Sequence, residues 1–494
     1  MDCISFFHLS NGDWEQIPLK TKTNFFYILL ILVFVNHPSY SYESSSAEKR
    51  KSVSVTIYNG GLGLVREVRT VKIPKGKSTL RYEDVASSIL PQTVRVKPAP
   101  ATPGFTVFEQ NYEYDLISEQ RLLEKYVGRE VTLYRTNPNS NDETMVKAKL
   151  IAYNNGPVYQ IGKEISLGYP GRVVVSSIPE NLFAKPTLVW ELATDDESEK
   201  TMEVSYQTGG MGWSADYNLN LNDKEDSAGI QSWVTLSNSS GTSFENATLQ
   251  LVAGKVQLVS NKPSREYEEE SYSKVSRSYA MKDSAPPEFK EENLSEYYLY
   301  TLDQPTTVGF NQTKQVQLFA QEAIKIEKRY IFDNLPMHAD NEKKFNNATV
   351  RYDILNSKNN SLGRPLPSGT MRIFKADSKG RQQLLGEDTI DHTPNDEWVK
   401  VSTGKAFDVV ANGKQMSYES FKLSNGYKAS YEVELRNRKK EDITIRLYGN
   451  TYGEWKITDN SHKYEKESNS KIFFDVKVPA GKVEKVVYTI ENRY

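Results

Sequence analysis

The chain has almost no cysteine and little histidine, and both shortages exclude kinds of chemistry. Its one cysteine is Cys3, and only five histidines occur in 494 residues. Beyond Cys3, disulfide frameworks, thiolate metal sites and cysteine nucleophiles are therefore excluded. The sequence also lacks Gly-x-Ser-x-Gly elbows, Gly-x-x-x-x-Gly-Lys-Ser/Thr loops and His-Glu-x-x-His helices. Histidine-based catalysis consequently has few candidates, and we expect no cofactor.

An excess of one charge sign is also missing. The 62 basic residues are balanced by 64 acidic ones, which gives a formal net charge of -2. Binding to nucleic acid relies on concentrated positive charge that neutralises phosphates. The sequence therefore predicts no nucleic-acid partner.

Long apolar runs are limited to residues 25–35, eleven residues that follow two lysines. Such a run is too short to cross a hydrocarbon core of about 30 Å as a helix. Small residues follow it, so region 1–41 is typical of a secretory signal, cleaved at Ser39-Tyr40-Ser41 or at Ser45-Ser46-Ala47. An uncleaved membrane anchor or a buried strand is the alternative. We expect an exported protein, whether periplasmic, envelope-associated or secreted, with no transmembrane span in its mature form.

Polar residues alternate with β-branched or aromatic ones along most of the chain, and tyrosine is abundant, at 30. This pattern is typical of antiparallel sheets with one solvated face. We expect a mainly β fold, made of multidomain antiparallel β-sandwiches with a small SH3-like or Sm-like barrel insert and one short helix. The expected domains are a β-meander over 53–117, the barrel over 118–179, a central β-sandwich over 187–423 and an Ig-like β-sandwich over 424–494.

The barrel is predicted from a short helical pattern that begins at Ser118 and ends at Gly128, followed by four strand-like runs. Some barrels of this kind bind RNA. The balanced charge and the export signal favour a structural insert instead.

Residues 261–292 combine dense charge with low hydrophobicity. Such a segment cannot bury enough apolar surface to offset the entropy lost on ordering. We predict a disordered surface loop, and its tyrosines leave a partner-binding strip as the alternative.

Three glycines, at 209, 210 and 212, precede Trp213 within a strand-like pattern. Glycine inside a strand usually marks a bulge or a bend. No phosphate-binding lysine and no helical pattern follow, so we predict a strand bend that Trp213 packs. A weak internal repeat is also present, because Val234–Asn238 and Val433–Asn437 are both strand-like and both end in asparagine.

His338, Asp340 and Glu342 are candidate metal ligands. On an extended segment these alternate residues project to one face and offer one nitrogen and two carboxylates. The alternative is a hydrated loop after Pro336.

A second candidate site contains Glu387, Asp388, Asp391 and His392, with Asp396 close by in the sequence. These side chains would supply a general acid or a cation site. Asp391 and His392 are adjacent, so on a strand they point to opposite faces and do not form a dyad. A hydrogen-bonded turn, in which aspartates accept from backbone amides, is the simpler alternative.

The block over residues 203–259 resembles an exported family of unknown function that includes the mucoidy-inhibitor proteins. The resemblance spans about residues 53–494 and implies a β-rich envelope or secreted protein, without established catalytic residues. The chain lacks the long helical coiled-coil insert of the mucoidy-inhibitor members, which puts a role in capsule control in doubt. Further matching motifs are Tyr58–Arg69, Leu122–Gly128, Pro186–Trp190, Tyr300–Leu302, Leu366–Thr370, Gly386–Pro394 and Glu432–Arg438.

Three functional hypotheses follow. The first is a non-catalytic binding or scaffold module of the cell envelope, with an envelope protein or a polysaccharide as its partner. The second is a hydrolase with acidic catalytic residues, acting on glycans, around Glu387 to Asp396. The third is a polysaccharide-binding module that uses exposed tyrosines such as Tyr112 and Tyr114.

Overall fold

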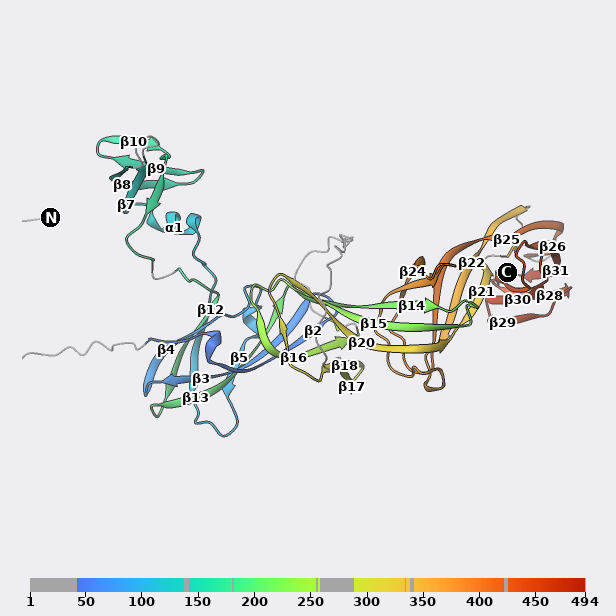
Figure 1. Cartoon of the computed structure of the whole chain (residues 1–494), viewed down its shortest axis with the longest axis horizontal. Helices are drawn as coiled ribbons and strands as arrows, with labels where there is room; N and C mark the ends of the chain where they lie inside the picture. Colours follow the sequence, from blue (N-terminus) through green and yellow to red (C-terminus); the bar gives the residue numbers. More distant parts are fainter. Residues whose placement is uncertain are drawn as a thin grey trace, which may run out of the picture. The chain divides into compact units, whose positions relative to one another are not determined.

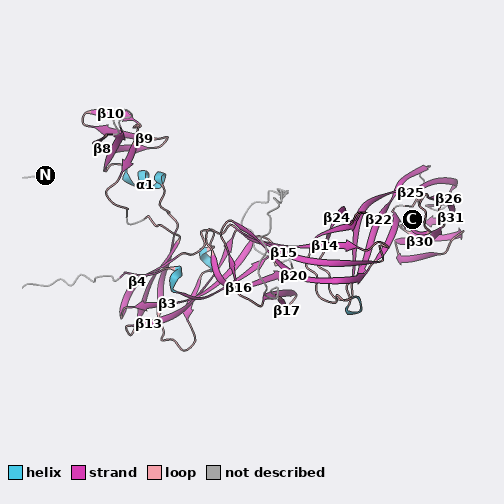
Figure 2. Cartoon of the chain, viewed as in Figure 1, coloured by secondary structure: helices cyan, strands magenta, loops and turns pink. Residues whose placement is uncertain are grey.

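The structure, a computed structural model, describes residues 42–136, 142–179, 182–254, 256–257, 288–333, 335–337, 342–421 and 425–493. The expected signal region, 1–41, lies outside these ranges, as does most of the expected loop. Strands dominate the described chain (Figure 2), which confirms the mainly β fold class. No helix among these residues has the length and apolar character needed to cross a membrane.

Two sheets form the first sandwich, and their strands are named as in Figure 1. Sheet I has the order β1-β4-β12-β6, and sheet II has the order β17-β18-β16-β2-β3-β13-β5, with β19 paired to β16. The strands of sheet I are β1 (Tyr42–Ser45), β4 (Gly76–Glu83), β6 (Thr106–Glu113) and β12 (Thr187–Thr194). Those of sheet II are β2 (Arg50–Tyr58), β3 (Leu62–Ile73), β5 (Arg95–Pro98), β13 (Ser198–Gly209), β16 (Phe244–Ala253), β17 (Phe289–Leu294), β18 (Tyr297–Leu302) and β19 (Thr306–Val308).

The structure differs from the β-meander expected over 53–117. Strands β2 and β3 form the predicted hairpin, but β4 leaves that sheet and pairs with β12 and β1 in sheet I. The place beside β3 is taken by β13, more than a hundred residues further along the chain. Local turn signals predict that a strand ends, and they do not predict which partner the next strand finds. Strand β17 also includes the last residues of the expected loop, 289–292.

The barrel region forms a sheet of its own, in the order β10-β9-β8-β7-β11, with one α-helix. Ser118 caps the helix by accepting a hydrogen bond from the backbone N–H of Arg121, and Gly128 follows with a φ of 85°. Leu133, Leu150 and Tyr159 form its buried core. Its elements are α1 (Glu119–Tyr126), β7 (Glu130–Thr136), β8 (Glu143–Tyr153), β9 (Pro157–Ile161), β10 (Glu164–Leu167) and β11 (Arg172–Val174).

Sheet III has the order β20-β15-β14-β23-β24 and shares one hydrophobic core with sheets I and II. Its strands are β14 (Met211–Leu221), β15 (Ser227–Asn238), β20 (Gln312–Lys325), β23 (Gly369–Ala376) and β24 (Gln382–Ile390). Strands β14 and β23 pair in parallel although they are distant in the sequence.

The glycine block is the point at which the chain passes from sheet II to sheet III. Gly209 ends β13, Gly210 adopts a φ of 74°, and Met211 begins β14. The backbone N–H of Ser239 donates to the carbonyl of Gly210 at 2.6 Å. Trp213 is buried below the bend, so the predicted strand bend is observed, and it connects two sheets.

We expect Gly210→Ala to destabilise the fold by about 1–3 kcal/mol. A Cβ at this position would lie 2.9 Å from the carbonyl of Ser239, in addition to the cost of the positive φ. Gly76→Ala is the matched control, because Gly76 has a φ of 93° and no atom within 4 Å of an added Cβ. Urea unfolding measures both variants. Equal losses would show that the close approach of Ser239 contributes nothing.

Sheet IV contains nine strands in the order β28-β31-β26-β25-β22-β21-β27-β30-β29. Phe474 of β30 and Tyr488 of β31 lie near opposite ends of this order, yet their ring centroids are 5.6 Å apart. The sheet therefore folds over a second core and forms a sandwich by itself. Its strands are β21 (Glu327–Phe332), β22 (Glu342–Leu355), β25 (Trp398–Ser420), β26 (Gly426–Asn437), β27 (Ile443–Asn450), β28 (Glu454–Asn460), β29 (Tyr464–Ser468), β30 (Lys471–Val478) and β31 (Val483–Arg493).

Sheet IV thus draws three strands from within residues 187–423, the range expected for the central sandwich. These strands are β21, β22 and β25. Strand β21 pairs with β27 and β25 pairs with β26 of the expected 424–494 domain, and β22 lies between β21 and β25. Strand β25 spans 23 residues and pairs with two strands. It pairs with β22 along most of its length and with β26 in its second half. The expected boundary between the two domains is therefore not marked by a linker in the sequence. A single strand, β25, pairs with β22 and with β26, and so joins the two expected domains.

The strand connectivity of β2–β20 is repeated in β21–β31. Strand β2 pairs antiparallel with β3 and parallel with β16, and β21 pairs in the same way with β22 and β27. Strand β15 lies between β14 and β20 as β26 lies between β25 and β31, and β16 pairs with β18 as β27 pairs with β30. In the second half, the single long strand β25 occupies the places that β13 and β14 occupy in the first half, beside β22 and beside β26.

The repeated asparagines noticed in the sequence occupy equivalent places in these two halves. Asn238 ends β15 and Asn437 ends β26. Each donates its amide to the carbonyl four residues ahead and to a carbonyl at the end of a distant strand. Each also accepts from the backbone N–H two residues ahead. Both side chains therefore close the same kind of turn.

The turn between β14 and β15 is attached to sheet IV by a carboxylate. Glu225 accepts from Lys375 at 2.6 Å and from the hydroxyl of Tyr352 at 3.0 Å, and it also pairs with Lys328. Burial alone raises the pKa of Glu225, but the two ammonium groups outweigh it and lower the pKa to about 2. The carboxylate therefore stays ionised and keeps its three partners at neutral pH.

Candidate functional site

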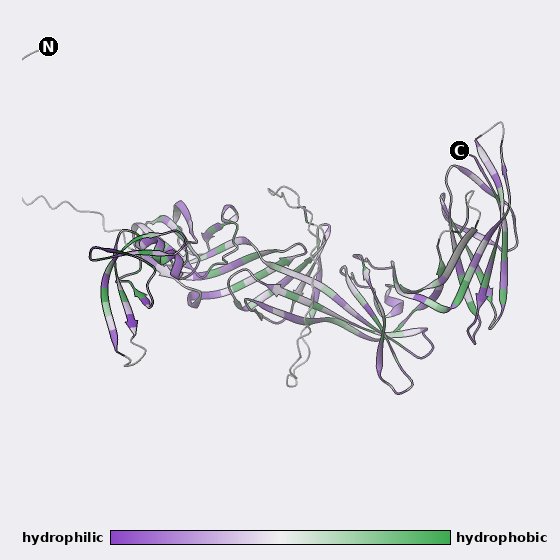
Figure 3. Cartoon of the chain, turned by 90° about the horizontal axis from the view of Figure 1, so that it is seen from above, coloured by the Kyte–Doolittle hydropathy of each residue, from purple (hydrophilic) through white to green (hydrophobic). Residues whose placement is uncertain are grey.

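Sheet III has one buried and one solvent-facing side. Along β14 and β15 buried residues alternate with partly or fully exposed ones. Figure 3 shows hydrophilic and hydrophobic residues interspersed along the strands of the chain. The buried set packs into the core, and the other set leaves a polar surface that we call the polar face of sheet III. On β14 and β15 this face includes Ser214, Asp216, Asn218, Asn220, Gln231, Trp233 and Thr235.

One row of polar side chains crosses all five strands of this face. Asp216 of β14 accepts from Arg372 of β23 at 2.9 Å and from Thr235 of β15 at 2.8 Å. Gln315 of β20 donates to Thr235 at 3.1 Å, and Arg372 lies 3.2 Å from Glu387 of β24. Each strand thus contributes one member, and each member is oriented by its neighbour.

Trp233 lies beside this row, on β15. It is directly opposite Asp216 on β14 and Gln317 on β20 in the strand register, and it is partly exposed. An indole ring here is unusual, because the other outward residues of β14 and β15 are polar or glycine. The face therefore combines fixed hydrogen-bonding groups with one aromatic surface.

Two of the sequence-predicted acidic-site residues, Glu387 and Asp388, lie on β24, and the structure gives them different surroundings. Glu387 belongs to the polar row through Arg372. Asp388 accepts backbone N–H bonds with both oxygens, from Thr389 at 2.9 Å and from Ser402 at 2.8 Å. Asp388 thus links β24 to β25, and each of its carboxylate oxygens accepts a hydrogen bond from the backbone.

Asp391 and His392 follow the end of β24. The Nδ1 atom of His392 accepts from the backbone N–H of Ser368 at 3.1 Å, and the carbonyl of Asp391 accepts from Thr393. Asp396 has a φ of 64° and donates its backbone N–H to Asn356. These contacts hold a loop in place, and they direct His392 to Ser368 rather than to Glu387.

The predicted metal ligands His338 and Asp340 lie outside the described residues. Glu342 begins β22, and its side chain is likewise outside the description. Among the residues that are described, no group of three or more His, Cys, Asp or Glu side chains is arranged to hold a metal ion.

A second surface feature is a polar hollow of about 470 Å³ on sheet IV, where β25, β26, β31 and β28 meet. Two β-bulges adjoin it, one on β25 and one on β28. On its lining the hydroxyls of Ser430 and Thr489 lie 2.8 Å apart, and Tyr418 stacks on Tyr427 with ring centroids 5.6 Å apart. The hollow offers hydroxyl and charged groups from several strands.

The two tyrosines proposed from the sequence for glycan contact differ in exposure. Tyr114 is 73% exposed, as expected. Tyr112 is partly buried and donates its hydroxyl to the carbonyl of Ser87 at 3.1 Å. Burial raises the pKa of Tyr112 to about 12, and its hydroxyl is committed to the fold.

The sequence did not single out Trp233, Asp216 or Arg372. The alternation along β14 and β15 was a signal that this face is polar. It does not show that Arg372 approaches Asp216, because the parallel pairing of β14 with β23 joins residues 156 positions apart. Only the sheet order places the row together.

Comparison with protein families matches residues 202–494 to the family described as "Domain of unknown function (DUF4139)". The matched region holds every strand of sheets III and IV, and so includes the polar face and the hollow. Comparison with curated proteins finds no significant match. Because the match covers more than half of the 494 residues, the chain belongs to the DUF4139 family, whose domain has no known function.

Proposed function

We propose that the chain is an exported, non-catalytic binding module of the cell envelope, and that the polar face of sheet III binds an envelope polysaccharide. The observation that carries this proposal is the row from Gln315 to Glu387, which crosses all five strands beside Trp233. Export rests on the apolar run 25–35 and its flanks. The resemblance to mucoidy-inhibitor proteins, which implies an envelope or secreted protein, supports the same proposal.

The chemistry of the face suits sugar hydroxyls. Amide, carboxylate and guanidinium groups each present two hydrogen-bonding atoms in a plane, which matches neighbouring hydroxyls on a pyranose ring. An indole provides an apolar surface for the C–H side of that ring. Arg372 pairs with both Asp216 and Glu387, so the row carries little net charge and favours an uncharged ligand.

The geometry of the face also favours an extended ligand. Five strands spaced about 4.8 Å apart give a surface roughly 19 Å wide. The side chains are held on strands and by one another, so little conformational entropy is lost when a ligand binds. These properties support recognition of a chain of sugars rather than of one small molecule.

The hydrolase alternative would use acidic residues near Glu387. A glycosidase needs two carboxyl groups on either side of the scissile bond, about 5–10 Å apart. Glu387 is paired with Arg372, and both oxygens of Asp388 accept backbone hydrogen bonds. Their contacts support a structural use of both carboxylates.

We expect Trp233→Ala to reduce binding to insoluble envelope polysaccharide at least tenfold, which corresponds to about 1.4 kcal/mol. Co-sedimentation of the purified chain, from residue 42 onward, with polysaccharide from the producing cell measures this. Trp398→Ala is the matched control, because Trp398 is 45% exposed and lies on β25 of sheet IV rather than on a strand of sheet III. Tyr418→Ala tests the hollow on sheet IV.

The outcomes separate the readings. Failure of the unmodified chain to sediment would contradict the binding proposal. Loss of sedimentation after protease treatment of the envelope would identify a protein partner, and loss in Tyr418→Ala alone would move the site to the hollow. Time-dependent release of soluble sugar that is abolished in Glu387→Gln would favour the hydrolase.

A further inference from the structure

Strand β1 is built into the first sandwich. It pairs in parallel with β4, with Tyr42 opposite Thr79 and Ser45 opposite Tyr82. Ser45 is fully buried, and the hydroxyl of Ser44 donates to Glu83 at 2.8 Å. These residues lie between the two sequence-predicted cleavage sites, after Ser41 and after Ala47.

A buried arginine depends on this strand. The Nη1 atom of Arg69 donates to the carbonyl of Ser45 at 2.8 Å and to the carbonyl of Glu83 at 2.7 Å. Arg69 is fully buried, so loss of a carbonyl acceptor would take a hydrogen bond from a desolvated guanidinium group. Just beyond β1, the backbone N–H of Ala47 donates to Asp84 at 3.0 Å.

Cleavage after Ala47 would remove β1 together with both of these contacts. It would leave Nη1 of Arg69 with one carbonyl acceptor and expose the edge of β4. Cleavage after Ser41 leaves every one of these contacts in place, and the new chain would begin at the first residue of β1.

We infer that the signal region is cleaved between Ser41 and Tyr42, so that the mature protein begins with β1, which completes sheet I. Ser39 and Ser41 supply the small residues that the processing enzyme requires on the amino side of the bond. The inference rests on the export part of the proposed function, and it is independent of what the polar face binds.

The decisive measurement is the intact mass and amino-terminal sequence of the chain exported by its own host. We expect the sequence to start at Tyr42. We also expect Ser41→Leu to block processing and Ala47→Leu, the matched control, to leave it unchanged. A start at Glu48 would overturn the inference while export stands. An unprocessed chain that stays in the cell would overturn export and the inference together.

A second measurement tests the physical reason without requiring export. Chains starting at Tyr42 and at Glu48 are produced with a removable tag and compared by native-state hydrogen exchange. Loss of a hydrogen bond to a charged group predicts about tenfold or more faster exchange of the β4 amides in the shorter chain. A shorter chain that fails to fold would also support the role of β1. Equal exchange in the two chains would overturn it.

Discussion

Replacing Glu67 with glutamine is expected to lower the free energy of unfolding by about 3–5 kcal/mol, one of the two largest effects we predict. The carboxylate is fully buried between sheets I and II and accepts from Arg69 at 2.6 and 3.0 Å, from Arg50 at 2.9 Å and from Tyr82 at 3.1 Å. A neutral amide would leave two guanidinium groups without a counter-charge in this core. Thermal and urea unfolding measure the loss.

Glu197→Gln is the matched control for this prediction. Glu197 pairs with Lys72 at 3.0 Å, and both side chains are more than half exposed, at 59% and 64%. Lys72 lies on β3, the strand that also carries Glu67. Surface pairs of this kind contribute about 0–1 kcal/mol, so the control is expected to unfold almost as the natural chain does.

A double replacement, Glu67→Leu with Arg69→Met, sharpens this test. With Glu67 and Arg69 both replaced by apolar side chains, only the guanidinium of Arg50 loses its counter-charge, whereas Glu67→Gln leaves two guanidinium groups without one, and removing a buried pair together often costs less than removing one partner. We therefore expect the double variant to be more stable than Glu67→Gln. Equal stability of Glu67→Gln and Glu197→Gln would show that the buried pair does not stabilise the fold.

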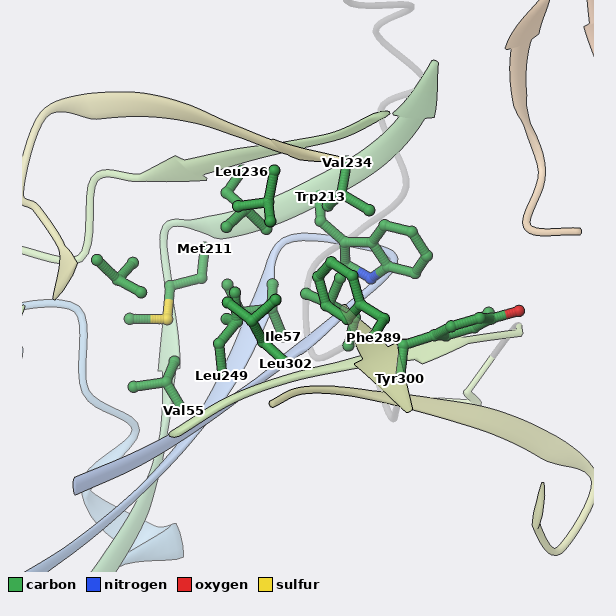
Figure 4. Close-up of a cluster of buried hydrophobic side chains, with 14 of the residues drawn as sticks. Val55, Ile57, Met211, Trp213, Val234, Leu236, Leu249, Phe289, Tyr300 and Leu302 are labelled. Carbon is green, nitrogen blue, oxygen red and sulfur yellow. The ribbon is translucent and has the colours of Figure 1, made fainter. Parts of the chain in front are cut away.

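Trp213→Ala is expected to destabilise the chain by about 3–5 kcal/mol, through lost burial and the cavity it leaves. The indole is 7% exposed and donates to the carbonyl of Val252 at 3.3 Å. Figure 4 shows it among side chains of sheets II and III, close to Phe289 and Tyr300. Because Trp213 lies three residues after Gly210, near the start of β14, its loss would loosen the packing of the two sheets.

Trp398→Ala is the control for the cavity, since a side chain that is 45% exposed leaves little empty volume when it is shortened. Trp213→Phe should fall between the two, because phenylalanine fills most of the space but donates no hydrogen bond. Urea unfolding of the three variants gives the order. If Trp213→Ala were as stable as Trp398→Ala, the packing role of Trp213 would be wrong.

The glycine block at residues 209–212 shows what a local sequence pattern can predict about the fold and what it cannot. Glycines without a phosphate-binding lysine, between two strand-like runs, predict a bend, and the positive φ of Gly210 agrees with that prediction. The pattern does not reveal that the bend carries the chain from one sheet to another. That property depends on β3 pairing with β13 and on β15 pairing with β14.

In the acidic segment from Glu387 to Asp396, by contrast, the local pattern did not predict the arrangement in the structure. Its residues are clustered in the sequence, and their cluster suggested joint chemistry. In the structure Glu387 joins a row with Arg372, Asp388 ties two strands together, and His392 contacts Ser368. Neighbours in a strand or a turn point in different directions, so closeness along the chain does not predict a common site.

The sequence by itself determined the β class, the start of the helix at Ser118, the bend at the glycine block and the two strands that end in asparagine, because each depends on residues near one another in the chain. Tertiary structure decided which strands pair, that β21, β22 and β25 belong to the last sandwich, and that Asp216, Arg372 and Trp233 share one face. Many segments of the chain have similar alternating patterns, so each strand has several possible pairing partners. Packing of the whole core selects among these partners, and no local sequence signal does.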